Sequence, residues 1–328
     1  MKNLVKLMMG MIMISMFMFS SCDKDDDPAP TPPADKSFET LKSYLLANDM
    51  DLPKVLDAWI TTAENVHTIM NDANAANDYY IIDIRKATDF AAGHIKDSHN
   101  ALLKDVLDTA ARSNSMAIVV VCYTGQTASH AVVALRLSGY PTAKVMKWGM
   151  SGWNSNNDHW TTNVGDAAVG SSAWIAPPGN LATNINYGDP KIGSSETDGA
   201  KLLKAQVKKM LDAGFQKIAN GDVIDNPGDY YINNFWAESD VTHYGHLKGA
   251  FRIKPLSLKG GEYKFYDPSR TAVTYCWTGQ TSSMVTAYMN VIGYKAKSLL
   301  FGTNGMIHSK LQSHKWTAAA AKNYPLVQ

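Results

Sequence analysis

Two cysteines open loops of nearly identical sequence in the two halves of the chain. The segment Cys122-Tyr-Thr-Gly-Gln-Thr127 returns 154 residues later as Cys276-Trp-Thr-Gly-Gln-Thr281. Each copy follows a β-branched run and leads into a stretch of helical character. In a strand, loop and helix of this kind, loop N–H groups and the positive end of the helix both favour a thiolate. The spacing therefore predicts two nucleophilic cysteines.

The elements that position these loops also recur in order. Apolar β-branched runs of strand length alternate with stretches of helical spacing, which is typical of an α/β fold with a mainly parallel sheet. Thr61 and Thr62 followed by Glu64 predict a capped helix. Three blocks recur with the cysteine loop at offsets of 151 to 154 residues, and this indicates a duplication. The blocks pair residues 78–84 with 229–235, 93–95 with 245–247, and 148–153 with 301–306.

The repeat predicts two tandem α/β domains, each with a mainly parallel central sheet flanked by helices. A helical lead-in precedes the first domain, and a linker rich in Asn, Gly, Ser and Thr separates the two. We expect this linker to wrap one domain or to carry short irregular strands. The predicted boundaries are 37–57 for the lead-in, 58–160 for domain 1, 161–199 for the linker and 200–328 for domain 2.

The N-terminus has the features of a targeting segment. Lys2 and Lys6 precede an apolar stretch over residues 7–19, which is too short to span a bilayer and ends at Ser20-Ser21-Cys22. The ending resembles the lipobox of bacterial lipoproteins and predicts a signal peptide over 1–21 with acylation at Cys22. An ordinary secretory signal is the alternative. The charged, Pro-rich stretch over 22–36 then predicts a flexible tether, and the expected location is the bacterial cell envelope, lipid-anchored at the outer membrane on its periplasmic or surface face.

Composition excludes several classes of function. The 328-residue chain carries a formal net charge of +1, and without residues 1–21 it has 29 basic against 30 acidic residues. Near-neutral charge argues against nucleic-acid binding. No closely spaced His, Cys and acidic residues have metal-ligand spacing. We therefore expect no metal, no cofactor, no nucleic acid and, as partners, small molecules and the membrane.

The motifs together resemble those of the rhodanese (sulfurtransferase) family. The residues that carry the resemblance are Asp83-Ile-Arg85, Phe90-x-x-Gly93-His94-Ile95, Cys122-x-x-Gly125-x-Thr127 and a late Gly-x-x-Gly-Trp at 149–153. The resemblance covers about residues 60–153 and 205–310, and the whole chain is similar to a tandem-domain lipoprotein of this family. It implies that a loop cysteine takes sulfur from a thiosulfate, mercaptan or persulfide donor and passes it to a thiol or cyanide. It assigns catalysis to Cys122 and Cys276, substrate binding to Tyr123, Thr124, Gly125, Gln126, Thr127, Trp277, Thr278, Gly279, Gln280, Thr281 and Arg85, and support to Asp83.

Departures from the family pattern leave alternatives open. Neither loop has a Lys or Arg, which weakens the expectation of thiosulfate as donor. In the second half, Asn234 and Trp236 replace Asp83 and Arg85, so we expect the first cysteine to be the better nucleophile toward an anion. The loops run six residues to a Thr, whereas the related phosphatases use one residue more and end in Arg. This disfavours phosphatase or arsenate reductase chemistry, and a non-catalytic module that binds anions or proteins is the other alternative.

Overall fold

The computed structural model describes residues 35–177 and 179–328. The predicted signal peptide, Cys22 and the tether up to residue 34 lie outside the described residues. Within the described range, no helix has the length and apolarity that crossing a membrane would require.

The first half is built on a parallel sheet in the order β1-β5-β4-β2-β3. Strand β2 (Tyr79–Asp83) is buried along its whole length, and β4 (Ala117–Val121) beside it is buried from Ile118 onward. Parallel strands are covered on both faces, so continuous apolar runs of this kind suit the centre of the sheet. The outer strands are β1 (Ile60–Thr61), β3 (His99–Asn100) and β5 (Lys144–Met146).

Short helices connect these strands. The predicted capped helix is confirmed as α3 (Ala63–Met70), where the hydroxyl of Thr62 accepts a hydrogen bond of 3.1 Å from the N–H of Asn65. The other helices are α4 (Ala87–Ala92), α5 (Val106–Ala110), α6 (Gln126–Arg136) and α7 (Met150–Trp153), with 3-10 turns at η1 (Ala75–Asn77), η2 (Leu103–Asp105) and η3 (Ser155–Asn157).

The second half has a parallel sheet in the order β7-β11-β10-β8, which corresponds to β1-β5-β4-β2. The predicted α/β class, with parallel sheets flanked by helices, is confirmed. The exact domain boundaries stay predictions. The strands are β7 (Lys217–Ile218), β8 (Tyr231–Asn234), β10 (Ala272–Tyr275) and β11 (Ala296–Leu299), and the helices are α8 (Gly199–Asp212), α9 (Asn220–Asp225), α10 (Glu238–Tyr244) and α11 (Gln280–Val291).

The linker follows the surface of the second half. Its strand β6 (Trp174–Ile175) pairs in antiparallel direction with β9 (His246–Leu247). Further along, the N–H of Ala182 donates to the carbonyl of Ala250 at 2.9 Å, and the N–H of Tyr187 donates to Lys264 at 2.8 Å. The linker thus lies along one half and also carries a short strand, which are the two alternatives that the sequence left open.

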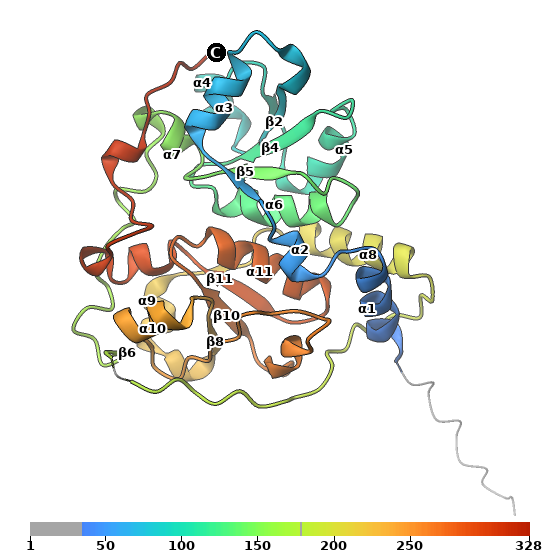
Figure 1. Cartoon of the computed structure of the whole chain (residues 1–328), viewed down its shortest axis with the longest axis vertical. Helices are drawn as coiled ribbons and strands as arrows, with labels where there is room; N and C mark the ends of the chain where they lie inside the picture. The colour runs from blue at the N-terminus through green and yellow to red at the C-terminus, as the bar shows by residue number, and fades with distance from the viewer. Residues whose placement is uncertain (1–34, 178) are drawn as a thin grey trace, which may run out of the picture. The chain divides into compact units, whose positions relative to one another are not determined.

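The C-terminal tail returns to the first half, which the predicted domain 2 did not anticipate (Figure 1). Val327 and His94 exchange two backbone hydrogen bonds of 2.9 Å. Tyr324 stacks on His67 with ring centroids 3.9 Å apart, and Lys322 forms a salt bridge of 2.6 Å with Glu64. The last residues of the chain therefore belong to the structure of the first half.

The helices that follow the two cysteine loops pack against each other between the two sheets, as α6 and α11 in Figure 1. Helix α8 also packs against α11, and the N-terminal helix α1 (Ser37–Ala47), followed by α2 (Leu52–Val55), packs against α8. One cluster of buried apolar side chains includes Val132 of α6, Leu202 of α8 and Met284 of α11. The two halves therefore share a hydrophobic core.

His130 of α6 is fully buried in this core. Its ring lies edge-on to Phe215 with centroids 5.7 Å apart, and neither ring nitrogen has a hydrogen-bond partner among the described residues. Burial disfavours the charged imidazolium and lowers the pKa of His130 to about 4.

We expect this histidine to make folding stability depend on pH. An unfolded chain holds a His of ordinary pKa, so it binds the proton more readily than the folded protein at pH below about 6.5. Stability is fully present above that pH and falls as the pH drops toward 4. His130→Leu should remove this dependence. Between neutral pH and about pH 5, the free energy of unfolding measured in urea should fall by about 2 kcal/mol more for the wild type than for the variant. Parallel pH profiles for the two proteins would contradict the assignment.

Candidate functional site

The first cysteine loop bends directly from β4 into α6. Gly125, the residue before the helix, has a φ of +83°, which favours glycine. This conformation turns backbone N–H groups toward the sulfur of Cys122. The sulfur accepts hydrogen bonds from Gly125 at 3.2 Å and from Ala128 at 3.3 Å. The predicted cradle of loop amides around the first sulfur is therefore present.

Burial opposes ionisation of this sulfur. Cys122 is only 2% exposed, and desolvation raises the pKa of its thiol. The backbone N–H groups of Ala128, Thr124, Gly125 and Thr127 act in the opposite direction, because they stabilise the thiolate. The resting residue is thus a thiol held in a site arranged for an anion.

The second loop has the same backbone geometry but a different partner for the sulfur. Gly279 has a φ of +77° before α11, and Cys276 is also 2% exposed. The sulfur of Cys276 accepts a hydrogen bond of 3.4 Å from the N–H of Ser282 and donates one of 3.6 Å to the hydroxyl of Ser282. Both cysteines are free thiols in the structure.

A second stretch of backbone closes over each loop. After β5, the N–H of Met150 donates to the carbonyl of Cys122 at 2.8 Å. After β11, Thr303 donates to the carbonyl of Cys276 at 3.0 Å. The glycines just before these donors, Gly149 and Gly302, lie so close to the loops that an added Cβ would collide with the cysteine carbonyls. The late Gly-containing motifs of the sequence thus hold the cysteine loops in place.

The two loops also contact each other through Gln126 and Gln280. Gln126 accepts a hydrogen bond of 2.8 Å from the N–H of Phe301, beside the second loop. Gln280 donates one of 3.5 Å to the carbonyl of Thr124 in the first loop. Both glutamines are almost fully buried, and each also bonds to a threonine hydroxyl of its own loop. The side-chain amides of both glutamines thus hold the two loops together, and the expected part of Gln126 and Gln280 in substrate binding stays a prediction.

The other loop side chains point to different surroundings. The Tyr123 hydroxyl donates to Asp89 and accepts from the N–H of Lys86 at 3.2 Å, so the ring is tied to the start of α4. Thr124 is buried, and its hydroxyl accepts from Gln126. Among the described residues, no hydrogen bond joins the hydroxyl of Thr127 or Thr281 to a sulfur. Nearby N–H groups supply that contact.

In the second half, aromatic rings surround the loop. Trp277 lies 4.3 Å from Trp236, 5.3 Å from Tyr244 and 5.2 Å from His314, measured between ring centroids. Thr278 is buried and donates to Gln280 at 3.3 Å. The second loop is therefore walled by rings on the side where Trp277 lies.

Arg85 and Asp83 form a fully buried ion pair with an N–O distance of 2.7 Å. The Arg85 guanidinium also donates to the carbonyl of Gly93 and to Asn157, both at 2.8 Å. These bonds commit the guanidinium to protein groups, so the pair holds the Gly93 turn next to β2. The expected role of Arg85 in binding an anionic donor stays a prediction that these contacts do not favour.

The sequence comparison of the two halves missed a cation near the second site. Lys254 lies exposed in the segment after β9, with its ammonium 5.3 Å from the centre of the Phe235 ring. Desolvation lowers the pKa of Lys254, the charge of Arg252 lowers it further, and Asp240 and Cys276 act against this. Cys276 therefore has a cation within electrostatic range, although Trp236 replaces the buried arginine.

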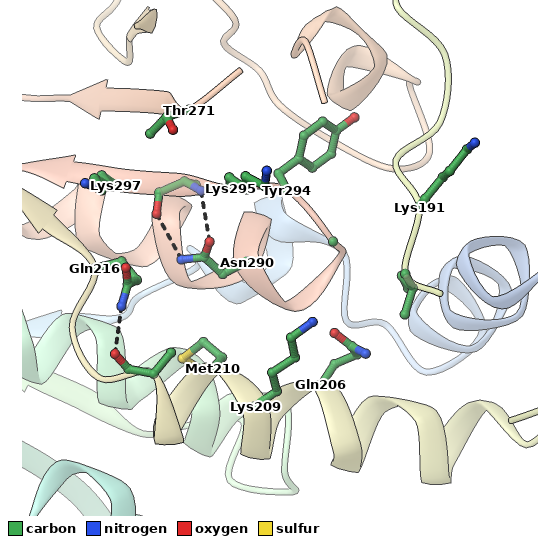
Figure 2. A pocket seen from close by; sticks show the side chains of 14 residues that line it. Lys191, Gln206, Lys209, Met210, Gln216, Thr271, Asn290, Tyr294, Lys295 and Lys297 are labelled. Carbon is green, nitrogen blue, oxygen red and sulfur yellow. Dashed lines mark hydrogen bonds between the residues drawn. The ribbon is translucent and has the colours of Figure 1, made fainter. Parts of the chain in front are cut away.

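Five cavities of about 210 to 730 Å³ have linings that include neither cysteine. One of about 500 Å³ opens beside the starts of β10 and β11 (Figure 2), where Gln206 and Lys209 extend into it from α8. Four lysines line it, and within the described part of the chain none of them pairs with a carboxylate. Residues 35–177 and 179–328 also contain no group of three His, Cys, Asp or Glu side chains suited to a metal ion.

Gly149 provides a test of the backbone contact that closes the first loop. Its φ of +62° and ψ of −151° belong to a region that glycine alone adopts readily. A Cβ there would also lie 2.6 Å from the nitrogen of Gly125 and 2.7 Å from that of Thr124. We expect Gly149→Ala to destabilise the protein by about 3 kcal/mol in urea unfolding.

Gly139 is the matched control for this substitution. It also has a positive φ, of +96°, but an added Cβ there meets no atom within 4 Å. Gly139→Ala should therefore lower the free energy of unfolding by only about 1 kcal/mol, which is the effect of the backbone conformation alone. Equal losses in the two variants would mean that the approach of Gly149 to the loop is unimportant.

Comparison with known proteins agrees with this site. A model of the rhodanese-like domain family matches residues 62–156. No curated protein sequence matches the chain. Among solved structures, similar chains include a rhodanese-like domain protein from Staphylococcus aureus, with 18% identity, 28% of this chain and 87% of that chain covered, and a TM-score of 0.25. A rhodanese-related protein from Thermoplasma volcanium has 18% identity, 29% and 89% coverage, and a TM-score of 0.25.

A thiosulfate sulfurtransferase from Pseudomonas aeruginosa is also similar, with 15% identity and a TM-score of 0.29. That match covers 87% of this chain, which spans about half (49%) of the Pseudomonas protein. The family match contains the whole Cys122 loop, the Asp83–Arg85 pair and the Gly149 segment, and it ends before the linker. The rhodanese-like domain family therefore matches residues 62–156 of this chain, which include the first cysteine loop.

Proposed function

We propose that the protein is a sulfurtransferase that carries sulfane sulfur on a loop cysteine as a persulfide. The observation that supports this is the convergence of loop N–H groups on the sulfur of Cys122 at the start of a helix. With thiosulfate as donor, the thiolate attacks the outer sulfur, a Cys S–S bond forms, the donor S–S bond breaks and sulfite leaves with its electron pair. Cyanide or a thiolate then attacks the outer persulfide sulfur and restores the cysteine thiolate.

We infer further that the second half, from residue 200 up to the C-terminal tail, forms a second domain of the same family. The support is the matching strand order of the two sheets and the matching backbone of the second loop. The chain would then carry two working cysteines, Cys122 and Cys276.

The contacts around the two sulfurs favour Cys276 as the faster site, contrary to the expectation from sequence. The charge of Arg85 is neutralised by Asp83, and burial raises the pKa of Cys122. Cys276 has the Ser282 hydroxyl in contact and Lys254 within electrostatic range. One added favourable interaction of about 1 kcal/mol with an anion corresponds to roughly fivefold in rate.

The burial of both sulfurs supports a second candidate, a non-catalytic module that binds anions or proteins. Cysteines that are 2% exposed can react only if the loop or its aromatic cover opens. Mass spectrometry of the intact protein after exposure to thiosulfate, mercaptan or persulfide donors separates the two candidates. Gain of one sulfur atom per reactive cysteine supports transfer, and an unchanged mass supports the binding module.

Single and double cysteine variants test the proposal directly. We expect Cys122→Ser with Cys276→Ser to abolish cyanide-dependent thiocyanate production. Cys122→Ser alone should keep most of the activity and Cys276→Ser should lose most of it. The activity left in Cys276→Ser should still rise with pH above the ordinary range of a thiol, because burial raises the pKa of Cys122. Full activity in the double variant would refute cysteine chemistry altogether.

Attachment to the envelope is a separate proposal. We propose that Cys22 is acylated and that the following Pro-rich stretch tethers the enzyme to the outer membrane, on the basis of the apolar stretch that ends in Ser-Ser-Cys. In a bacterial host, Cys22→Ala should give an unprocessed or released protein by metabolic fatty-acid labelling and membrane fractionation. Labelling of the variant equal to that of the wild type would contradict acylation at this residue.

A further inference from the structure

The two cysteine loops differ in the residue that lies six positions after the cysteine. This residue is Ala128 in the first half and Ser282 in the second, and both place a backbone N–H near the sulfur, at 3.3 and 3.4 Å. Only Ser282 adds a hydroxyl, 3.6 Å from the sulfur of Cys276. The first half presents a methyl group at the same place.

The Ser282 hydroxyl is the first of a chain of buried hydroxyls. It lies 2.8 Å from the hydroxyl of Ser298 on β11, which donates to the carbonyl of Gly279 at 3.3 Å. The Ser283 hydroxyl donates to the carbonyl of Gly279 at 2.6 Å and lies 3.2 Å from the hydroxyl of Ser298. Ser282, Ser283 and Ser298 have no exposed surface. Buried hydroxyls are costly unless they are hydrogen-bonded, and every hydroxyl of this chain has a partner.

The first half lacks this chain by substitution at two positions. Strand pairing sets Val120 beside Val145 in the first sheet and Thr274 beside Ser298 in the second. Val120 and Thr274 both lie two residues before their cysteine, so Val145 is the counterpart of Ser298. Ser129, the counterpart of Ser283, keeps its bond of 2.7 Å to the carbonyl of Gly125. The difference is therefore confined to the hydroxyls nearest the sulfur.

The direction of the hydrogen bonds can reverse without movement of heavy atoms. In the thiol form, the S–H of Cys276 donates to Ser282, Ser282 donates to Ser298, and Ser298 donates to the Gly279 carbonyl. When the sulfur is an anion, rotation about one C–O bond lets the Ser282 hydroxyl donate to it. Ser298 can then donate to the oxygen of Ser282, while Ser283 keeps its bond to the Gly279 carbonyl. In a buried site, a hydrogen bond from a hydroxyl to an anion is stronger than a hydrogen bond between two neutral groups.

We propose that Ser282 is a catalytic residue of the second site and that Ser298 positions it, so that the two hydroxyls stabilise the Cys276 thiolate as it forms. The proposal rests on the proposed function in one respect, which is that this thiolate is the attacking group. Ser282 and Ser298 distinguish the two sites, because Cys122 has only backbone N–H groups to stabilise its thiolate.

Several ionisable groups lie around the second loop and belong in the pH response of its sulfur. Lys254, from the segment after β9, is within electrostatic range, and Arg252 and Asp240 act on that lysine. His314 stacks on Trp277 of the loop, and Tyr275 precedes the cysteine in β10. These groups stay in place when Ser282 is changed, so a difference between serine and alanine isolates the hydroxyl.

The test compares alkylation of the two cysteines within one full-length molecule. Iodoacetamide labelling at a series of pH values, with peptides containing Cys122 and Cys276 measured separately by mass spectrometry, gives a pH midpoint for each sulfur. Opening that uncovers the sulfur while its contact with Ser282 is kept lowers the rate but does not move the midpoint. We expect Ser282→Ala to raise the Cys276 midpoint by about one pH unit, which slows labelling near pH 7 about tenfold, and to leave Cys122 unchanged.

Two further variants complete the design. Ser298→Val should raise the Cys276 midpoint by a smaller amount, because Ser282 remains but loses its partner. Ala128→Ser with Val145→Ser installs the pair in the first half and should lower the Cys122 midpoint. An unchanged Cys276 midpoint in Ser282→Ala, or equal shifts at both cysteines, would overturn the proposal.

Sulfur transfer is measured separately on the same proteins. If Ser282→Ala moves the midpoint but the wild type makes no thiocyanate, the hydroxyl assignment stands and the sulfurtransferase proposal fails. If the wild type transfers sulfur and the midpoint does not move, only the hydroxyl assignment fails.

Discussion

The structure around each cysteine depends on the close approach of a second backbone segment. The N–H of Met150 reaches the carbonyl of Cys122, and the N–H of Thr303 reaches that of Cys276. This approach requires a residue without a Cβ at Gly149 and Gly302, both with positive φ. Because this hydrogen bond fixes the carbonyl of the cysteine, the N–H groups of the loop remain directed toward the sulfur.

The same constraint brings the two sites together. The residues before these glycines, Trp148 and Phe301, take positive φ and lie in an aromatic cluster that Trp160, just before the linker, and Trp316 near the C-terminus complete. Gln126 then bonds to the N–H of Phe301 and Gln280 to the first loop. A movement of either loop would therefore break a hydrogen bond that joins it to the other half.

Burial and polarity have opposite effects on the reactive atoms. Removing a sulfur from water favours the neutral thiol, whereas N–H groups, a hydroxyl and a nearby cation favour the anion. At Cys122 burial has the larger effect on the pKa of the thiol, even with several amides in opposition. At Cys276 the chain adds Ser282 and Lys254 to the same backbone cradle. The two halves thus repeat one geometry with different chemical surroundings.

The sequence by itself determined the local parts of this protein. A buried strand that turns into a helix is specified by an apolar β-branched run, then a cysteine, then a glycine as the fourth residue of the loop. Because this pattern occurs twice, the sequence also specified two such sites in an α/β fold. Only the tertiary structure decided what surrounds each sulfur. Ser298 reaches Ser282 through packing of β11 behind α11, and Lys254 approaches through a segment after β9. Gln126 meets Phe301, 175 residues away, and the C-terminal tail returns to the first half. These contacts join residues far apart in the chain, and hydrophobic periodicity reports which face of an element is buried but not which partner covers it.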